Sequence, residues 1–116
     1  MFLNLNHKTL KVYQATQSLT TEVYKLSLKL PPEEKFSMAQ QIRRAVLSVK
    51  LNLAEGSSRR TIAERKRFFE ISRSSLVEVD AIIEAAVELG YLRIEELENV
   101  GKLINGSFAM LSRMIE

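Results

Sequence analysis

The chain has 116 residues, 46% of them hydrophobic and 27% charged, which is the composition of an ordinary soluble globular domain. It contains no cysteine, which excludes disulfides and thiolate metal sites, and its one histidine leaves most zinc and acid–base sites without ligands. We expect a single domain over residues 1–116 that forms its core without a cofactor.

The net charge of +3 is unevenly distributed along the sequence. Residues 1–42 carry a net charge of +2, residues 43–73 carry +6 and residues 74–116 carry −5. Such segregation indicates contacts with charged partners or between subunits. No secretory signal is recognisable, and the longest nearly apolar run, 45–54, is about half a membrane span, so we expect a cytoplasmic protein with no membrane partner.

Residues 7–30 are predicted to form the first helix, because apolar residues recur there at steps of three and four. These residues are Val12, Ala15, Leu19, Val23, Leu26 and Leu30. Pro31 and Pro32 end the helix, since proline lacks the N–H group and disfavours a helical residue before it. We expect His7 to be solvated at the start of this helix.

The stretch 38–56 is predicted to be a helix with two apolar faces. At about 100° per residue, a broad stripe falls on one side. It consists of Met38, Ile42, Ala45, Val46, Val49 and Leu53. A narrower stripe of Leu47, Leu51 and Ala54 lies roughly opposite. The broad stripe serves the core of the bundle, and the narrow one needs another surface, so we predict that Leu47, Leu51 and Ala54 form an oligomer interface.

The ends of this central helix also have sequence signals. Ser37 followed by Gln40 is the pattern of a capping box, and Gly56 is predicted to end the helix in a left-handed conformation. A polar loop with two arginines follows.

Two further helices are predicted, at 62–89 and from about residue 94 onward. Thr61 with Glu64 repeats the capping-box pattern, and Gly90 closes the third helix. The third helix has an apolar stripe of Ile62, Phe68, Phe69, Leu76, Val79, Ile83, Ala86 and Val87. The stripe of the last helix is Leu97, Val100, Ile104, Phe108, Leu111 and Ile115. Gly101 and Gly106 lie inside the last helix, where they either permit the close approach of a neighbour or are simply tolerated.

Four helices with short connections predict an all-α fold, an antiparallel up-down four-helix bundle with long helices. No strand-like alternation, low-complexity segment or linker interrupts the pattern.

Four stretches of the sequence carry a family resemblance. They are LKVYQATQSL, the Leu30-Pro31 break followed by Glu34, QIRRAVLSVKLNLAEG at 41–56 and ERKRFFEISRSSLVEVD at 64–80. Together they resemble the small bacterial four-helix-bundle proteins encoded by intervening sequences in 23S ribosomal RNA genes, over nearly the whole chain. Tyr13 stands where a tryptophan is common, and Ser74-Ser75 where Gly-Ser is common, at a position of helix packing.

The resemblance implies an up-down bundle that assembles through its helices into a ring of five subunits. A similar protein is the accessory variability determinant of diversity-generating retroelements, which presents a basic surface to nucleic acid and to a reverse transcriptase. A homo-oligomer with RNA, DNA or a protein as partner is therefore implied.

The basic residues between positions 43 and 73 are candidate nucleic-acid-binding residues, because clustered Lys and Arg neutralise phosphates and release counterions. They are Arg43, Arg44, Lys50, Arg59, Arg60, Arg65, Lys66, Arg67 and Arg73. Arg59, Arg60 and Arg67 are the favoured contacts. The alternative is internal pairing, since Glu70 lies at helical spacing from both Lys66 and Arg73. Arg65 falls inside the apolar stripe, where it either snorkels or meets a carboxylate.

Other polar residues have structural interpretations. Arg44 and Glu55 share a polar face of the central helix, and we predict that they are structural ion-pair residues, within or between chains, with no catalytic role. Phe68 and Phe69 are predicted to pack in the core rather than to stack on bases.

The acidic residues after position 77 are predicted to form a solvated face or to contact a basic partner, and a Mg²⁺ site is the less favoured alternative. They are Glu78, Asp80, Glu84, Glu88, Glu95, Glu96 and Glu98. No Gly-rich phosphate loop, nucleophile elbow or zinc-ligand spacing is present.

The sequence therefore predicts a non-enzymatic oligomeric bundle, without cofactor or metal, that binds RNA or DNA through its basic surface. The alternative is a protein–protein adaptor that docks a partner enzyme such as a reverse transcriptase. A metal-dependent enzyme is the last choice.

Overall fold

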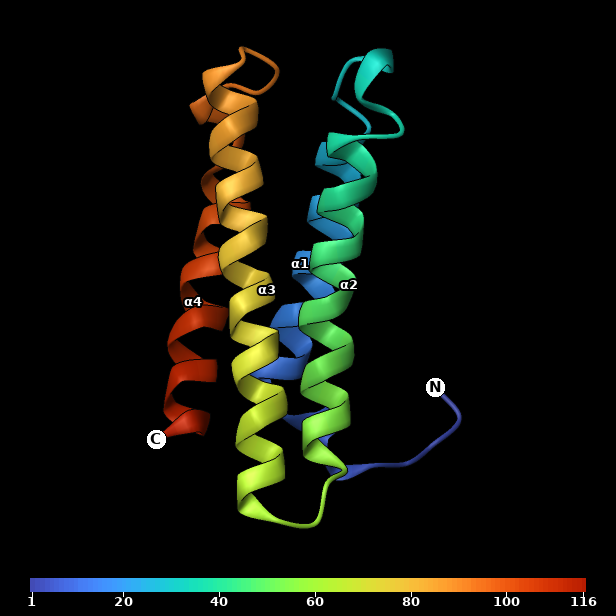
Figure 1. Ribbon diagram of the computed structural model, residues 1–116, viewed down its shortest axis with the longest axis vertical. Coiled ribbons are helices and arrows are strands. Elements are labelled where there is room, and N and C mark those ends of the chain that lie inside the picture. The colour runs from blue at the N-terminus through green and yellow to red at the C-terminus, as the bar shows by residue number, and fades with distance from the viewer.

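Four α-helices run alternately up and down along a common axis (Figure 1). They are α1 (Lys11–Ser27), α2 (Met38–Ser57), α3 (Ile62–Glu88) and α4 (Glu98–Ile115). Short 3₁₀ turns at Asn6–Thr9, Pro32–Glu34 and Ile94–Glu96 precede α1, α2 and α4. The computed structural model describes every residue from Met1 to Glu116 and measures 44 × 28 × 20 Å. The predicted all-α four-helix fold is confirmed.

Each helix packs against its neighbours in the chain, and α4 closes the bundle by packing against α1. The apolar stripes predicted from the sequence meet at the centre. The largest apolar side chains that are fully buried there are Leu19, Val23, Val46, Val49, Leu53, Leu76, Val79 and Leu111. Burying a side chain of this size stabilises the fold by about 1.5–3 kcal/mol. None of the helices has an apolar stretch long enough to cross a lipid bilayer.

Four residues of the predicted stripes lie outside this core: Ala15, Ile62, Phe68 and Phe108. Ile62 is 72% exposed, Phe108 is 42% exposed and Phe68 is half-buried, so their assignment to the core was wrong. Ile62 is the first residue of α3 and lies at the end of the bundle. Phe108 lies under the guanidinium of Arg73, which is 5.6 Å from its ring centroid.

The seam between α2 and α3 is held by small polar side chains. Ser72 donates a hydrogen bond of 2.6 Å to the carbonyl of Val49, and the hydroxyls of Ser48 and Ser75 are 2.7 Å apart. At the packing position noted in the sequence, Ser74-Ser75, Ser75 is buried and Ser74, which stands where glycine is common, is exposed. These contacts require the two helix backbones to approach closely along the seam.

Gly56 permits the same close approach at the end of α2. A Cβ atom there would lie 2.8 Å from Cε1 of Phe69 and 2.9 Å from Cβ of Phe68. Gly90 is the one residue with positive φ, at 81°, so the predicted left-handed stop at Gly56 was wrong and the one at Gly90 is confirmed. The helix continues through Gly56 because its glycine is needed for space rather than for a turn.

The remaining end signals had mixed outcomes. Thr61 accepts a hydrogen bond of 3.1 Å from the backbone N–H of Glu64, as predicted for the start of α3. The side chain of Ser37 caps nothing, and the carboxylate of Glu34 instead accepts from the N–H of Met38 at 3.3 Å. The first α-helix is shorter than predicted at both ends: a 3₁₀ turn and an extended Leu10 precede it, and it ends at Ser27, before Leu30 and the two prolines.

The two glycines inside α4 have no close neighbour. An added Cβ at Gly101 or Gly106 would meet nothing within 4 Å. Of the two readings of these glycines, the structure supports tolerance rather than close approach.

Candidate nucleic-acid interface

The antiparallel topology separates charge between the two ends of the bundle. We divide each helix at its middle and call the half that holds the α2–α3 loop (1–19, 48–75 and 107–116) the basic end. The other half (20–47 and 76–106) is the acidic end; it holds the α1–α2 and α3–α4 connections (Figure 1). The basic end has ten Lys and Arg and four Glu, whereas the acidic end has seven Lys and Arg and ten Asp and Glu. The net charges are therefore +6 and −3.

The two ends also differ in how their cations are paired. Lys25, Lys29, Arg93 and Lys102 at the acidic end each lie within 4.0 Å of a carboxylate. At the basic end Arg59 alone does, with Glu55 one helical turn away. The positive charge of the basic end is therefore largely uncompensated within the chain.

Five of the nine predicted contacts gather at the basic end around the α2–α3 loop. They are Arg59, Arg60, Arg65, Lys66 and Arg67. The guanidinium of Arg59 lies 4.8 Å from the ring centroid of Phe68, which holds it in place. Arg65 is exposed, and its Nε donates a 2.8 Å hydrogen bond to the carbonyl of Arg59. Of the two expectations for Arg65, snorkelling or a carboxylate partner, the carboxylate partner was wrong: Arg65 meets a backbone carbonyl, and its terminal nitrogens have no partner in the chain.

Three other predicted contacts are half-buried along helix seams, where their charge lies over aromatic rings. Arg43, Lys50 and Arg73 lie 5.6 Å from the ring centroids of Tyr24, Tyr13 and Phe108, respectively. Arg43 also donates to Ser27 Oγ at 2.8 Å, and Arg73 to Ser112 Oγ at 3.1 Å. These contacts fix the three side chains against the bundle and separate them from the loop cluster.

Arg44 and Glu55 are not paired with each other within the chain. Glu55 pairs with Arg59, and Arg44 is exposed in the acidic half. Eleven residues of helix separate Arg44 from Glu55, about 16 Å, so a bond between them within one chain is impossible. Pairing of Arg44 with a second chain stays a prediction.

The proposed internal pairs of Glu70 are absent. Neither Lys66 nor Arg73 lies within 4.0 Å of its carboxylate, although the spacing allows it. The predicted pairs of Glu70 were therefore wrong, and among the nine predicted contacts Arg59 alone pairs with a carboxylate.

Three basic residues at the same end were missed by the sequence analysis. Lys8 and Lys11 precede or begin α1, and Arg113 lies in the last turn of α4. They lie far from residues 43–73 in the sequence, but an up-down bundle places the start of its first helix and the end of its last beside the second loop. The predicted up-down order of four helices already implies that these residues lie at the same end as the second loop.

His7 lies at this end as well, and the prediction that it is solvated was wrong. It is 9% exposed, and its ring contacts the ring of Tyr13 edge-on, with centroids 4.9 Å apart. Burial and the neighbouring charge of Lys8 lower its pKa. The imidazole is therefore neutral at pH 7.

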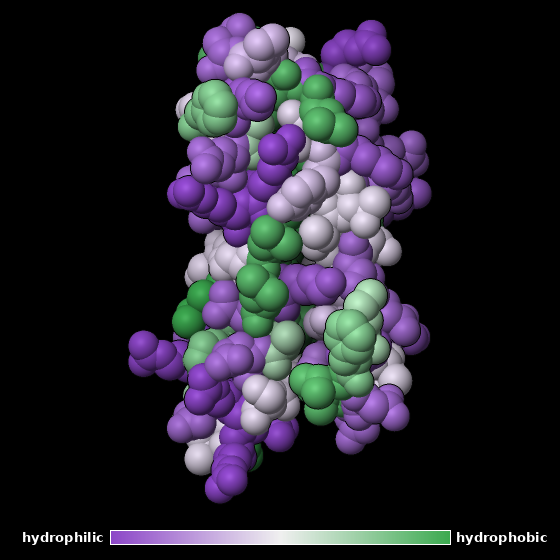
Figure 2. All heavy atoms as spheres, turned by 90° about the vertical axis from the view of Figure 1, so that its right-hand side faces the viewer, coloured by the Kyte–Doolittle hydropathy of each residue, from purple (hydrophilic) through white to green (hydrophobic).

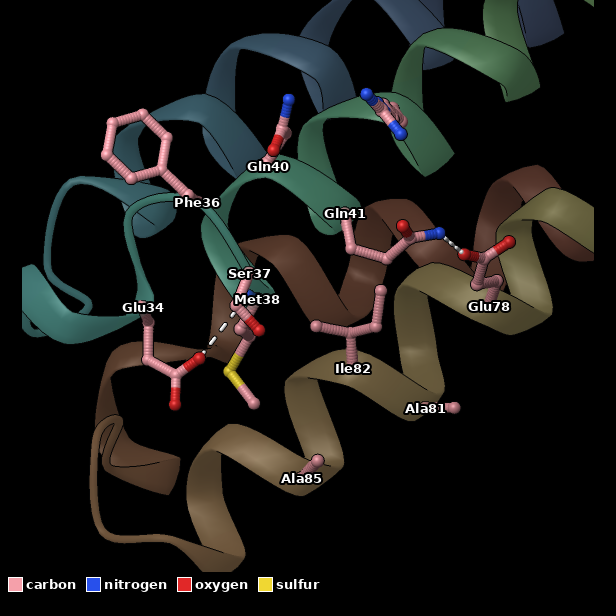
Figure 3. Close-up of a pocket in the computed structure, with 11 residues that line it drawn as sticks. Glu34, Phe36, Ser37, Met38, Gln40, Gln41, Glu78, Ala81, Ile82 and Ala85 are labelled. Atoms are coloured by element: carbon pink, nitrogen blue, oxygen red, sulfur yellow. Dashed lines mark hydrogen bonds between the residues drawn. The ribbon is translucent and has the colours of Figure 1, made fainter.

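The acidic end has a groove of about 680 Å³ between the start of α2 and the second half of α3 (Figure 3). Met38 and Ile82 lie between the two helices, and the ring of Phe36, 82% exposed, stands at the rim. Gln41 bridges to Glu78 across the groove. Its lining mixes apolar and amide side chains with the charged Glu34, Arg44 and Glu78.

The outward face of α2 exposes the narrow apolar stripe. Leu47 and Leu51 are 37% and 61% exposed, and Ala54 is partly buried. Figure 2 looks at the side on which α2 lies and shows a hydrophobic strip at the middle of this face, bordered by hydrophilic side chains. The predicted interface residues are thus available to a second molecule.

The acidic row Asp80, Glu84 and Glu88 is exposed along α3. No three His, Asp or Glu side chains in the chain converge as metal ligands would. Phe69 is buried in the core and Phe68 is half-buried beneath Arg59, so neither ring is presented for base stacking.

The protein is thus an antiparallel four-helix bundle with one basic end whose charge is largely uncompensated. The chain belongs to the 23S rRNA-intervening sequence protein family, whose model matches residues 8–113. A similar solved structure is a protein of unknown function from the S23 ribosomal protein family of Bacteroides thetaiotaomicron. It has a TM-score of 0.82 and 21% sequence identity, and the match covers 90% of this chain and 98% of that one. At this identity it shows the shared fold alone. No curated protein matches the sequence.

Proposed function

We propose that this protein is a non-enzymatic scaffold that binds nucleic acid, RNA or DNA, through its basic end. The observation that carries the proposal is the imbalance in pairing: ten Lys and Arg lie at this end, and only Arg59 has a carboxylate partner. Unpaired surface cations are what a phosphate backbone neutralises, with release of counterions. A surface of this kind gives affinity with little sequence preference.

Three of these cations are consecutive residues of α3: Arg65, Lys66 and Arg67 follow Glu64, which lies in the first turn of the helix. Arg65 and Arg67 are exposed, so their charges are accessible to the phosphate groups of a nucleic acid.

The test is filter binding of structured RNA and of duplex DNA at 50 and 200 mM salt. We expect affinity to fall by one to three orders of magnitude across this range if several phosphates are contacted. Absence of salt-sensitive binding to either nucleic acid would contradict the proposal.

The proposal includes assembly with copies of the same chain through Leu47, Leu51 and Ala54. Their exposure on the outward face of α2 leaves apolar surface that a second copy would cover. The family resemblance favours a ring of five. A ring would repeat the basic end around an axis and turn weak phosphate contacts into avidity.

Assembly is tested by Leu51→Glu, with Val77→Glu as the matched control, since Val77 is also more than half exposed but lies on α3. We expect Leu51→Glu to reduce the mass measured by light scattering to that of one chain while the helical circular dichroism is kept. The control should remain assembled. A wild-type chain that is monomeric at high concentration, or a Leu51→Glu variant that unfolds, would contradict this interface.

A second candidate is a protein–protein adaptor, which the groove at the acidic end favours. Its apolar floor and exposed Phe36 suit an apolar side chain of a partner, and the surrounding net charge of −3 suits a partner with a basic surface. The likeness to the accessory protein of diversity-generating retroelements suggests a reverse transcriptase as the kind of partner. Capture of one protein that survives nuclease treatment and is lost in Phe36→Ser would favour this function over the first.

A further inference from the structure

A cleft of about 550 Å³ opens at the basic end, next to the loop cluster of cations. It lies between the 3₁₀ turn before α1, the end of α2, the start of α3 and the end of α4. Residues near both ends of the sequence and from its middle thus form one site. Its volume is within the range of about 300–1,000 Å³ usual for small-molecule sites, and it is large enough for one nucleotide but not for a base pair with its stacked neighbours.

One wall of the cleft is cationic. Arg65 and Lys66 line it, and neither has a carboxylate within 4.0 Å. The Nε of Arg65 is held by the carbonyl of Arg59 at 2.8 Å, which orients the guanidinium and leaves its outer nitrogens free. Glu116 is the one acidic residue of the lining. A phosphate group is the ligand that two adjacent free cations favour.

The rest of the lining includes apolar side chains, some of them exposed. Phe69 forms the buried floor, Leu10 and Ile62 are 41% and 72% exposed, and Met114 is half-buried. Exposed apolar surface beside cations gives the cleft two chemical characters. A flat, weakly polar group attached to a phosphate would cover this surface and gain from its burial.

Asn6, His7 and Ser57 provide neutral polar groups in the same lining. The buried imidazole of His7 is uncharged at pH 7, so it offers one N–H donor and one nitrogen acceptor, and the amide of Asn6 offers both as well. Donors and acceptors together match the edge of a base, whereas an acyl chain would leave them unpaired.

We propose that this cleft binds a single unpaired nucleotide of a nucleic acid strand, with its phosphate on Arg65 and Lys66 and its base against Leu10 and Ile62. The inference rests on the proposed function and sharpens it: the basic end distinguishes nucleic acids with unpaired nucleotides from continuous duplexes. Bases inside a duplex are stacked and cannot enter a cleft of this size.

The test compares a blunt 12-base-pair RNA duplex with the same duplex that has three unpaired nucleotides at its 3′ end. Both are labelled and titrated with the full-length protein at 100 mM salt, with fluorescence anisotropy as the readout. We expect about tenfold tighter binding of the duplex with the overhang, which is the size of effect that covering one base typically gives.

Matched variants assign the effect to the cleft. Ile62→Ser removes apolar surface at the cleft without changing charge, and Ile94→Ser is its control, because Ile94 is also 72% exposed but lies at the acidic end. Ile62→Ser should remove most of the tenfold preference and leave the affinity for the blunt duplex within twofold. Ile94→Ser should change neither.

The outcomes separate this inference from the function on which it rests. Salt-sensitive binding of both RNAs with equal affinity would overturn the cleft proposal and keep nucleic-acid binding. A preference for the overhang that survives Ile62→Ser would place the site elsewhere and overturn it too. Binding to phosphatidylglycerol vesicles without binding to either RNA would assign the phosphate chemistry to a lipid headgroup and overturn both proposals.

Discussion

The two ends of the bundle differ in how far their charged side chains are paired. At the acidic end Glu96 accepts from Lys29 Nζ at 2.6 Å and from the backbone N–H of Arg93 at 3.0 Å, so one carboxylate ties together the α1–α2 and α3–α4 connections. Tyr91 donates to Glu34 across the same end at 3.0 Å. At the basic end Arg73 of α3 donates a hydrogen bond of 3.1 Å to Ser112 of α4, but no ion pair joins two helices. The acidic end is thus closed by an ion pair between its two connections, and the basic end is not.

The helix dipole does not separate the two ends. Glu95 and Glu96 occupy the turn before α4, where acids suit the helix dipole, and Glu96 caps the backbone of Arg93. At the basic end Glu64 lies in the first turn of α3, where an acid is equally favourable, whereas Glu88 in the last turn of α3 is at the acidic end and is unfavourable. The two ends therefore differ in the pairing of their cations and not in how their charges suit the helix dipoles.

The largest expected difference between the two ends is in how much the affinity for nucleic acid falls when two of their cations are neutralised. Arg60 and Arg67 are exposed and make no hydrogen bond or ion pair within the chain, so Arg60→Gln with Arg67→Gln should leave the fold intact. Each lost phosphate contact lowers the salt slope by about 0.9, so the pair should lower the affinity for duplex DNA on the order of tenfold to a hundredfold at 100 mM salt. Filter binding measures it.

The control for that pair is Lys35→Gln with Lys102→Gln, which removes the same charge from the acidic end. It should change affinity by less than threefold, because long-range attraction alone is lost and salt screens it. Equal effects of the two pairs would show that net charge, and not the basic end, governs binding.

Replacing a glycine by alanine should change the free energy of unfolding in opposite directions at the two ends. Gly56→Ala puts a methyl group 2.8 Å from the ring of Phe69, so we expect it to lower the free energy of unfolding by about 1–2 kcal/mol. Gly101→Ala meets nothing within 4 Å in the first turn of α4 and should raise it by about 0.5–1 kcal/mol. Urea denaturation followed by circular dichroism measures both, and destabilisation by Gly101→Ala would contradict the open space at that position.

Acid should weaken the two ends in separate pH windows. Burial and the charge of Lys8 lower the pKa of His7 from 6.5, so the unfolded chain takes up that proton first and stability falls as pH decreases below about 6.5. The hydrogen bonds from Lys29 and from the backbone of Arg93 lower the pKa of Glu96, so its contribution is lost only as pH falls below 4.5.

NMR titration tests the order of these windows. The chain has one histidine, so its ring proton reports His7 directly, and we expect a midpoint below 6.5. His7→Asn should remove the first loss of stability and leave the second. A His7 midpoint at or above 6.5 would show that the ring is solvated and would contradict the loss of stability predicted below pH 6.5.

The sequence by itself determined the number of helices, most of their core residues and the ends marked by Thr61 and Gly90. These features depend on local chemistry: apolar period, a side chain that caps its own helix and a glycine with positive φ. The nine basic residues were found as a group for the same reason, since they are close in the chain. Gly56 was misread because a glycine needed for space and one needed for a turn look alike until the neighbouring Phe68 and Phe69 are in place.

Only the tertiary structure decided which cations share a surface. It brought Lys8, Lys11 and Arg113 to the loop between α2 and α3, and it fixed Arg43, Lys50 and Arg73 over aromatic rings along the helix seams. It buried His7 against Tyr13 and formed the cleft beside it from four separate segments. All of these contacts are between residues on different helices. The periodicity of apolar residues within one helix does not determine the distance from its side chains to those of another helix.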